Sequence, residues 1–157
     1  MAPAAKHLLV VYQSRSGSTS TLCDAVVAGA TEAAGDAVER RVLHGLDAGV
    51  DDVEWADAII LGTPANFGYM SGILKDFLER IYHPCLDRTA GTPYTAFVKG
   101  STDAAGAVAS IERIVAGLRW RQILPPLVVV GDLGPGHLEA AFELGATVAA
   151  GLDAGIF

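Results

Sequence analysis

Charged side chains, cysteines and long apolar runs are scarce in this sequence of 157 residues. Only 18% of the residues are charged, and 11 basic against 18 acidic side chains give a formal net charge of −7. Because 51% of the residues are hydrophobic, the composition excludes a disordered chain. The acidic balance, without a cluster of Lys or Arg, argues against a nucleic acid or an anionic membrane as a partner.

The apolar runs, such as Leu8–Tyr12, are only as long as a strand, whereas a membrane helix needs about 20 apolar residues. The segment before Leu8 also lacks the apolar core of a signal peptide. Cys23 and Cys85 are far apart and form neither a CxxC pair nor a zinc-binding pattern. We therefore expect a cytoplasmic, metal-free protein with reduced thiols, folded as a single domain over residues 1–157.

Strand-like apolar runs alternate with segments of helical periodicity. The predicted strands are 8–12, 38–43, 56–62, 94–98 and 127–130, and the predicted helices are 18–34, 70–81, 108–118 and 138–148. This alternation predicts an α/β fold with a parallel sheet covered by helices on both faces. Ligands of such sheets bind beyond the carboxyl ends of the strands, where the strand order reverses. Three loops follow those ends, at 13–19, 63–70 and 100–106.

The first loop combines four hydroxyl side chains, an arginine and a glycine: Ser14, Arg15, Ser16, Gly17, Ser18 and Thr19. A helix begins here, and the unpaired N–H groups of a helix N-terminus favour an anion. Helix capping explains one hydroxyl but not four, so we interpret the segment as a phosphate-binding loop. The GxxxxGK[ST] and GxGxxG motifs are both absent, which excludes the usual triphosphatase and dinucleotide loops.

The second loop mixes aromatic, amide and thioether side chains and could form the wall of a site for a flat ring. A simple turn is an equally good interpretation of the same residues. The third loop consists of small residues, whose two glycines would permit close approach of the backbone. Its alternative is a strand-to-helix connection capped by Ser101, Thr102 or Asp103.

Together these segments resemble the flavodoxin-like superfamily, and within it the NAD(P)H-dependent FMN reductases and NAD(P)H:quinone oxidoreductases. The most specific part is the Thr-Pro-x-x-Phe-Gly-x-Met-Ser block that begins at Thr63; the first loop and Gly131-Asp132 before an Ala-rich helix add to it. The resemblance implies a flavodoxin-like three-layer sandwich around a five-stranded parallel sheet of order 2-1-3-4-5, with FMN at the switch point.

The resemblance also implies a role for each loop. The first would hold the FMN phosphate, the second would line the isoalloxazine, and the third would contact the pyrimidine edge and the ribityl chain. The residues concerned are Ser14, Arg15, Ser16, Gly17, Ser18 and Thr19; Pro64, Ala65, Asn66, Phe67, Gly68 and Tyr69; and Gly100, Ser101, Thr102, Asp103 and Gly106. FMN would carry the hydride chemistry, so no catalytic side chain and no metal ligand are expected.

Two functions are consistent with this resemblance. One is an oxidoreductase that transfers electrons from NAD(P)H to a quinone or similar small acceptor, and the other is a flavodoxin-type electron carrier that docks to redox proteins. The absence of an aromatic residue from 100 to 106 would leave one flavin face open, which favours the reductase. Reductases of this type are often homodimers or homotetramers. A flavin-free binding module is a third reading, which the intact hydroxyls of the first loop disfavour.

The remaining reactive side chains are expected to be structural. Cys85 beside a histidine is weak evidence for redox catalysis, and Trp120 ends a helix where packing is the expected role. The histidines stand alone in the sequence, and His7, placed before the first strand, is expected to be solvated.

Overall fold

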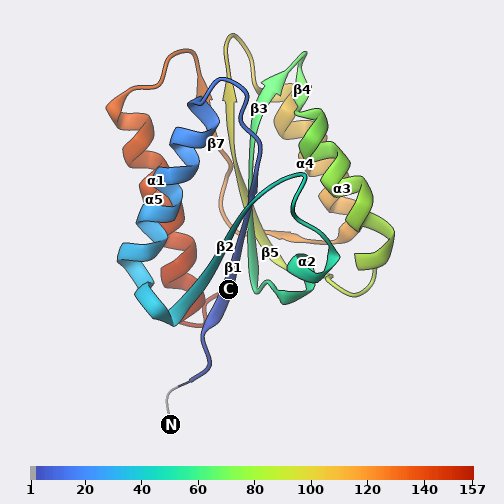
Figure 1. Cartoon of the computed structure of the whole chain (residues 1–157), viewed down its shortest axis with the longest axis vertical. Helices are drawn as coiled ribbons and strands as arrows, with labels where there is room; N and C mark the ends of the chain where they lie inside the picture. The colour runs from blue at the N-terminus through green and yellow to red at the C-terminus, as the bar shows by residue number, and fades with distance from the viewer. Residues whose placement is uncertain (1–2) are drawn as a thin grey trace.

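The computed structural model describes residues 3–157, in which strands and helices alternate (Figure 1). The strands are β1 (Lys6–Tyr12), β2 (Val38–His44), β3 (Ala58–Asn66), β4 (Tyr69–Met70), β5 (Pro93–Gly100), β6 (Arg121–Gln122) and β7 (Leu127–Val130). The helices are α1 (Ser18–Ala34), α2 (Val50–Trp55), α3 (Gly72–Cys85), α4 (Ala105–Leu118) and α5 (Pro135–Asp153), with a short 3-10 helix η1 (Gly35–Ala37) after α1.

The sheet has the order β2-β1-β3-β5-β6, and these neighbours pair in parallel. The last position is shared, because β6 pairs with the start of β5 and β7 pairs with its end. Between the two, the Thr95 hydroxyl donates to the Leu124 carbonyl at 3.1 Å. The structure thus confirms the predicted order 2-1-3-4-5, with the fifth strand divided into two pieces.

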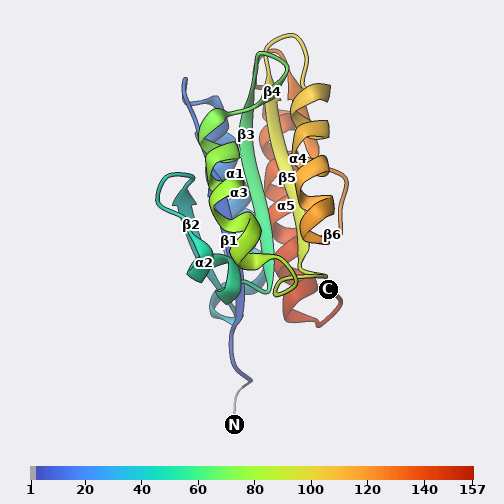
Figure 2. The ribbon, with the colours of Figure 1, turned by 90° about the vertical axis from the view of Figure 1, so that its right-hand side faces the viewer.

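Helices cover both faces of the sheet. Helices α1 and α5 lie on one face, and α2, α3 and α4 lie on the other (Figures 1 and 2). Strand β1 shows why: Leu8 and Val10 enter the core under α1 and α5, whereas Leu9 and Val11 enter the core under α3 and α4. A strand that is buried on both faces reads as a continuous apolar run, which is what made the central strands predictable.

Helices α1 and α5 pack with their backbones in close approach. A Cβ atom on Gly29 would lie 1.9 Å from the Phe142 carbonyl oxygen, and one on Gly145 would lie 1.9 Å from the Val26 carbonyl oxygen. Each helix therefore needs a glycine where the other crosses it. The glycines let both helices lie flat against the same face of the sheet.

The structure corrects several predicted boundaries. The helix predicted at 70–81 begins at Gly72 and ends at Cys85, and Met70 belongs to β4. The Ser71 hydroxyl accepts the Leu74 N–H at 3.0 Å and so fixes this start. The periodicity predicts neither α2 nor the two-residue strands β4 and β6, because such short elements contain too few residues to show a repeat.

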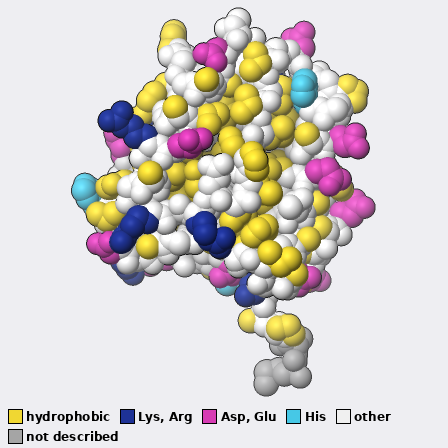
Figure 3. Space-filling model, turned by 180° about the vertical axis from the view of Figure 1, so that it is seen from behind, with side chains coloured by type: hydrophobic (Ala, Val, Ile, Leu, Met, Phe, Trp, Pro, Cys, Tyr) yellow, Lys and Arg dark blue, Asp and Glu magenta, His cyan; other side chains and the backbone are white. Residues whose placement is uncertain are grey.

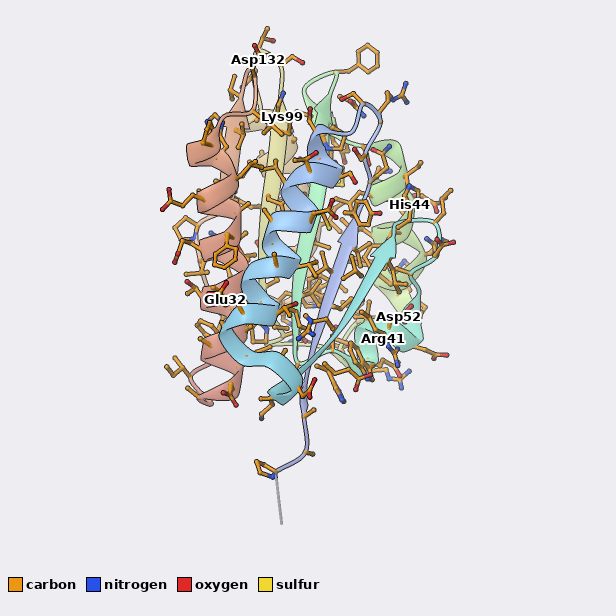
Figure 4. All side chains as sticks on the ribbon, turned by 60° about the vertical axis from the view of Figure 1, so that its left-hand side comes forward. Glu32, Arg41, His44, Asp52, Lys99 and Asp132 are labelled. Carbon is orange, nitrogen blue, oxygen red and sulfur yellow. The ribbon has the colours of Figure 1, made fainter. Side chains whose placement is uncertain are left out.

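Side-chain contacts hold α2 against the edge of the sheet. His7 is part of β1 and is half-buried, with its ring stacked on Trp55 at 4.3 Å between centroids and its Nδ1 2.9 Å from the Trp55 carbonyl oxygen. The expectation that His7 is solvated ahead of the strand is therefore wrong. From β2, the Arg41 guanidinium lies over the Trp55 ring at 4.0 Å from its centroid and pairs with Asp52 at 3.1 Å (Figure 4).

The β7 part of the opposite edge of the sheet is apolar. Val128 and Val130 of β7 are 43% and 49% exposed, and apolar side chains gather on this side of the molecule (Figure 3). With Val108 and Ala109 of α4 they line a surface hollow of about 510 Å³. No helix within residues 3–157 is long and apolar enough to cross a membrane.

The α1–α5 contact predicts a pair of glycine effects. Gly29→Ala and Gly145→Ala should each lower the free energy of unfolding by about 1–3 kcal/mol, because the new methyl group meets backbone that cannot yield. Gly136→Ala, in the first turn of α5 with open space around it, should instead raise the free energy by about 0.4–1 kcal/mol. Urea unfolding of the three variants checks this, and equal effects at all three positions would contradict the packing.

Candidate functional site

The three loops that follow β1, β3 and β5 lie at the same end of the sheet, at the top of Figure 1. Lys99, the penultimate residue of β5, and Asp132, which follows β7, lie at this end too (Figure 4). The Lys99 ammonium donates to the Gly100 carbonyl at 3.2 Å. The structure therefore brings together the loops that the sequence assigns to one site.

The first loop is closed by a serine side chain and opens into α1. The Ser14 hydroxyl accepts the N–H groups of Gly17 at 3.2 Å and Ser20 at 3.1 Å. Gly17 has φ +99°, a left-handed conformation that glycine adopts without strain, and it is the N-cap of α1. The N–H groups of Ser18 and Thr19, the first two of the helix, meet no acceptor in the described part of the chain.

These features fit a phosphate ester. The first turn of α1 contains no acidic residue, so nothing opposes an anion at the positive end of the helix. Ser16 is exposed, Ser18 is half-buried, and Arg15 is exposed without an ion pair among the described residues. The loop therefore offers two free amides, several hydroxyls and a guanidinium around one turn.

The second loop is a hairpin rather than an irregular loop. Pro64, Ala65 and Asn66 extend β3, Tyr69 begins β4, and the two strands pair in antiparallel through Asn66 and Tyr69. The pairing of β3 with β1 ends at Gly62, so the missing N–H of Pro64 leaves no partner unsatisfied in β1. This explains why a proline does not stop the strand, contrary to the predicted loop over 63–70.

The turn of this hairpin holds Phe67 in an unfavourable conformation. Phe67 and Gly68 have φ +52° and +70°, as a two-residue type I′ turn requires. Positive φ costs a bulky residue about 1 kcal/mol or more, and the Phe67 side chain recovers nothing because its relative exposure is 108%. A strained aromatic fully in solvent points to a ligand-contacting role, and Tyr69 beside it is also exposed.

The third loop is shorter than predicted. Gly100 ends β5 and Gly106 lies in the first turn of α4. The Asp103 carboxylate accepts the Ala105 N–H at 3.0 Å, although the N-cap position of α4 is occupied by Ala104. A Cβ on Gly106 would lie 1.9 Å from the Gly68 carbonyl oxygen, which means that this glycine serves contact between the second and third loops. Ser101 and Thr102 remain exposed at the tip.

Sequence reasoning missed three polar residues at this end. Thr63 and Ser71 connect β3 to α3, because the Thr63 hydroxyl accepts the Ser71 N–H at 2.9 Å. Gln13 is only 6% exposed and lines a hollow of about 180 Å³ with Arg15 and Asn66. Gln13 directly follows the buried strand β1, and Thr63 is the last residue of the buried part of β3, so their positions gave a signal; Ser71 follows the short strand β4 and gave none.

The thiols lie in the core. Burial raises the pKa of Cys23 to about 12 and also raises the pKa of Cys85, so both stay protonated near neutral pH. Trp120 is buried as expected, and its indole N–H donates to the Thr89 hydroxyl at 3.0 Å. Among residues 3–157 no group of three His, Cys, Asp or Glu side chains could hold a metal ion.

Comparison with known proteins gives one family. Residues 9–121 match the model of a flavodoxin domain. A flavodoxin of Aquifex aeolicus is 35% identical over 74 residues, which cover 47% of this chain and 39% of that protein. An NAD(P)H dehydrogenase (quinone) of Geobacter sulfurreducens is 35% identical over 95 residues, 46% of this chain and 47% of that protein. The chain thus spans less than half of the length of these curated relatives.

The solved structures agree on the fold. A flavodoxin from the domain Archaea superposes with a TM-score of 0.79 at 21% identity, covering 91% of this chain and 96% of that one. At this identity the likeness shows the fold, and the arrangement of strands and helices described above is that of a flavodoxin-like protein.

The Ser14 contacts give a prediction about stability. Ser14→Ala should lower the free energy of unfolding by about 1 kcal/mol, because the N–H groups of Gly17 and Ser20 lose their acceptor. Ser16→Ala removes a neighbouring hydroxyl that accepts no bond within the described residues and should change the free energy by less than about 0.5 kcal/mol. Chemical denaturation of both variants without added ligand checks the difference, which vanishes if Ser14 does not cap α1.

Proposed function

Because this chain belongs to the flavodoxin domain family, we propose that it binds FMN at the carboxyl ends of β1, β3 and β5 and passes electrons from NAD(P)H to a quinone or similar small acceptor. The observation that carries the proposal is the start of α1, where a left-handed glycine turn leaves two amide hydrogens free beside several hydroxyls. This is the chemistry that a phosphate ester requires.

Each loop then has a distinct task. The phosphate would be held by the amides of Ser18 and Thr19, the hydroxyls of the first loop, and Arg15. The hairpin of Pro64–Tyr69 would line the isoalloxazine, with Phe67 presenting an apolar surface to it. The third loop, Gly100–Gly106, would approach the pyrimidine edge and the ribityl chain. Bound FMN supplies the hydride and electron chemistry, and the chain supplies position and charge.

Two features support the reductase over the carrier. The third loop contains no aromatic residue, so one face of a flavin stacked on the hairpin would remain open to a nicotinamide or a quinone ring. A curated relative that matches almost half of the chain bears the name NAD(P)H dehydrogenase (quinone).

The second candidate is an electron carrier that docks to redox proteins. The flavodoxin of Aquifex aeolicus matches a similar share of the chain, and the exposed Phe67 is suited to contact with a protein as well as with a ring. The oligomeric state stays a prediction of a homodimer or homotetramer.

Flavin titration tests the phosphate loop. Wild-type protein should bind FMN and turn yellow, and Ser16→Asp should weaken the affinity by at least about tenfold, because it places a like charge against the phosphate. Ala28→Asp adds the same charge on an exposed position farther along α1 and should leave the affinity nearly unchanged. Equal affinities of all three proteins would mean that the first loop only caps the helix.

Turnover then separates the two functions. FMN-loaded reductase should oxidise NADPH or NADH steadily when a quinone is present, and oxidation should stop when the quinone is exhausted. A carrier should accept electrons from dithionite and show no quinone-dependent oxidation of either nucleotide, which would exclude the reductase.

Removing the Phe67 side chain, as in Phe67→Gly, should change stability and FMN affinity in opposite directions. Phe67→Gly relieves the left-handed strain and should raise the free energy of unfolding of the flavin-free protein by about 0.5–1 kcal/mol, while weakening FMN binding. Phe67→Ala keeps the strained conformation and should weaken FMN binding without the gain in stability. Unfolding curves and flavin titrations of both variants check this, and unchanged FMN affinity in both would remove Phe67 from the site.

A further inference from the structure

A polar hollow lies beside the first loop on the side of α3, separate from the start of α1. It measures about 180 Å³ and is lined by Gln13, Arg15, Asn66, Ser71, Gly72 and Ile73. None of these residues is acidic. The hollow joins the end of β1 to the first turn of α3, on the face of the sheet opposite to α1.

Gln13 lines this hollow and has a side-chain oxygen without a hydrogen-bond partner. Its side chain is 6% exposed, and its Oε1 is the one buried side-chain oxygen or nitrogen among the described residues without a partner. The backbone N–H of Gln13 donates to the Gly62 carbonyl at 3.1 Å, which ties the residue to the sheet. An unsatisfied buried acceptor destabilises the protein, so a hydrogen-bond donor from a ligand would recover free energy here.

The start of α3 supplies donors to the same hollow. Ser71 accepts the Leu74 N–H, whereas the N–H groups of Gly72 and Ile73 meet no acceptor among residues 3–157. The first turn of this 14-residue helix contains no acidic residue, and nothing lies within 4 Å of where a Gly72 Cβ would be. Two free amides and the helix dipole therefore favour an anion at this position.

We propose that this hollow is a second ligand site that takes a phosphorylated sugar. The phosphate would accept from the Gly72 and Ile73 amides, and a sugar hydroxyl would donate to Gln13 Oε1. A simple anion would accept from the two amides but would give Gln13 no hydrogen-bond donor. A ligand that carries both a phosphate and hydroxyl groups would meet both requirements. A nicotinamide nucleotide contains a ribose phosphate. Only the choice of such a nucleotide as the natural ligand rests on the proposed function.

The test uses inorganic phosphate, ribose 5-phosphate and NADPH as probes, followed through the backbone amide resonances of the whole chain with and without saturating FMN. Ribose 5-phosphate should shift the amides of Gly72 and Ile73 and the Gln13 side-chain amide in both states, with at least fivefold higher affinity than inorganic phosphate. Competition by NADPH for these shifts identifies a nucleotide as the source. Binding of ribose 5-phosphate without competition by NADPH identifies a free sugar phosphate.

Matched variants isolate the groups. Gly72→Pro removes one amide donor at the first helical position, where proline is tolerated and where Ser71, with ψ 145°, accepts a following proline. It should weaken ribose 5-phosphate at least fivefold, whereas Gly72→Ala keeps the amide and should bind like wild type. Gln13→Met should abolish the preference for ribose 5-phosphate over inorganic phosphate.

Three results would overturn the proposal: no saturable shift at Gly72 and Ile73, equal binding by Gly72→Pro and Gly72→Ala, or loss of the shifts once FMN is bound. The last would mean that the hollow belongs to the flavin. Failure to bind FMN is read independently from the flavin titration, and the flavin-free sample still tests the hollow in that case.

Discussion

The parallel pairing of β1, β3 and β5, each buried on both faces, is the constraint on which the candidate site depends. These strands have little freedom to slip, because a shift of one residue would exchange the side chains of the two cores. Their carboxyl ends therefore lie together at one end of the sheet, and the helices α1, α3 and α4 begin there. The register of β1, β3 and β5 therefore positions the candidate site, and few side-chain contacts within the site are needed to hold it.

The starts of α1, α3 and α4 at this end of the sheet are capped in different ways. In α1 and α3 a serine hydroxyl accepts the third helical N–H: Ser14 accepts from Ser20, and Ser71 accepts from Leu74. The first two amides of each helix have no acceptor among the described residues. In α4 the Asp103 carboxylate takes the first amide and adds a negative charge. The starts of α1 and α3 thus favour an anion, whereas the Asp103 carboxylate disfavours an anion at the start of α4. Of these three helix starts, one that leaves two amides free lies on each face of the sheet.

The contact between Gly106 and the Gly68 carbonyl ties the hairpin to α4. It fixes the base of the turn that carries Phe67, so the aromatic ring is held out into solvent on a rigid support. Rigid presentation lowers the entropic cost of ordering a ligand against the ring. Phe67 and Gly68 belong to neither core cluster, so the strained conformation of Phe67 disturbs no core packing.

Continuous apolar runs mark strands that are buried on both faces, so they allowed the central strands and the three loops to be predicted, whereas the strand order followed from the resemblance to flavodoxin-like proteins. Two kinds of feature escaped it. The hairpin of β3 and β4 was hidden by Pro64, a residue that usually ends a strand. Here it lies beyond the pairing of β3 with β1 and within the pairing of β3 with β5. The roles of Gln13 and Ser71 depend on which helix start lies across from each, and that relation exists only in the folded chain.

The affinity of FMN relative to riboflavin tests the central claim most directly, because the two ligands differ only in the phosphate. If the free amides of Ser18 and Thr19 at the start of α1 hold that phosphate, FMN should bind at least about a hundredfold more tightly than riboflavin, and the ratio should fall at high salt. Equal affinities of FMN and riboflavin would contradict the account, because the start of α1 would then contribute nothing to binding.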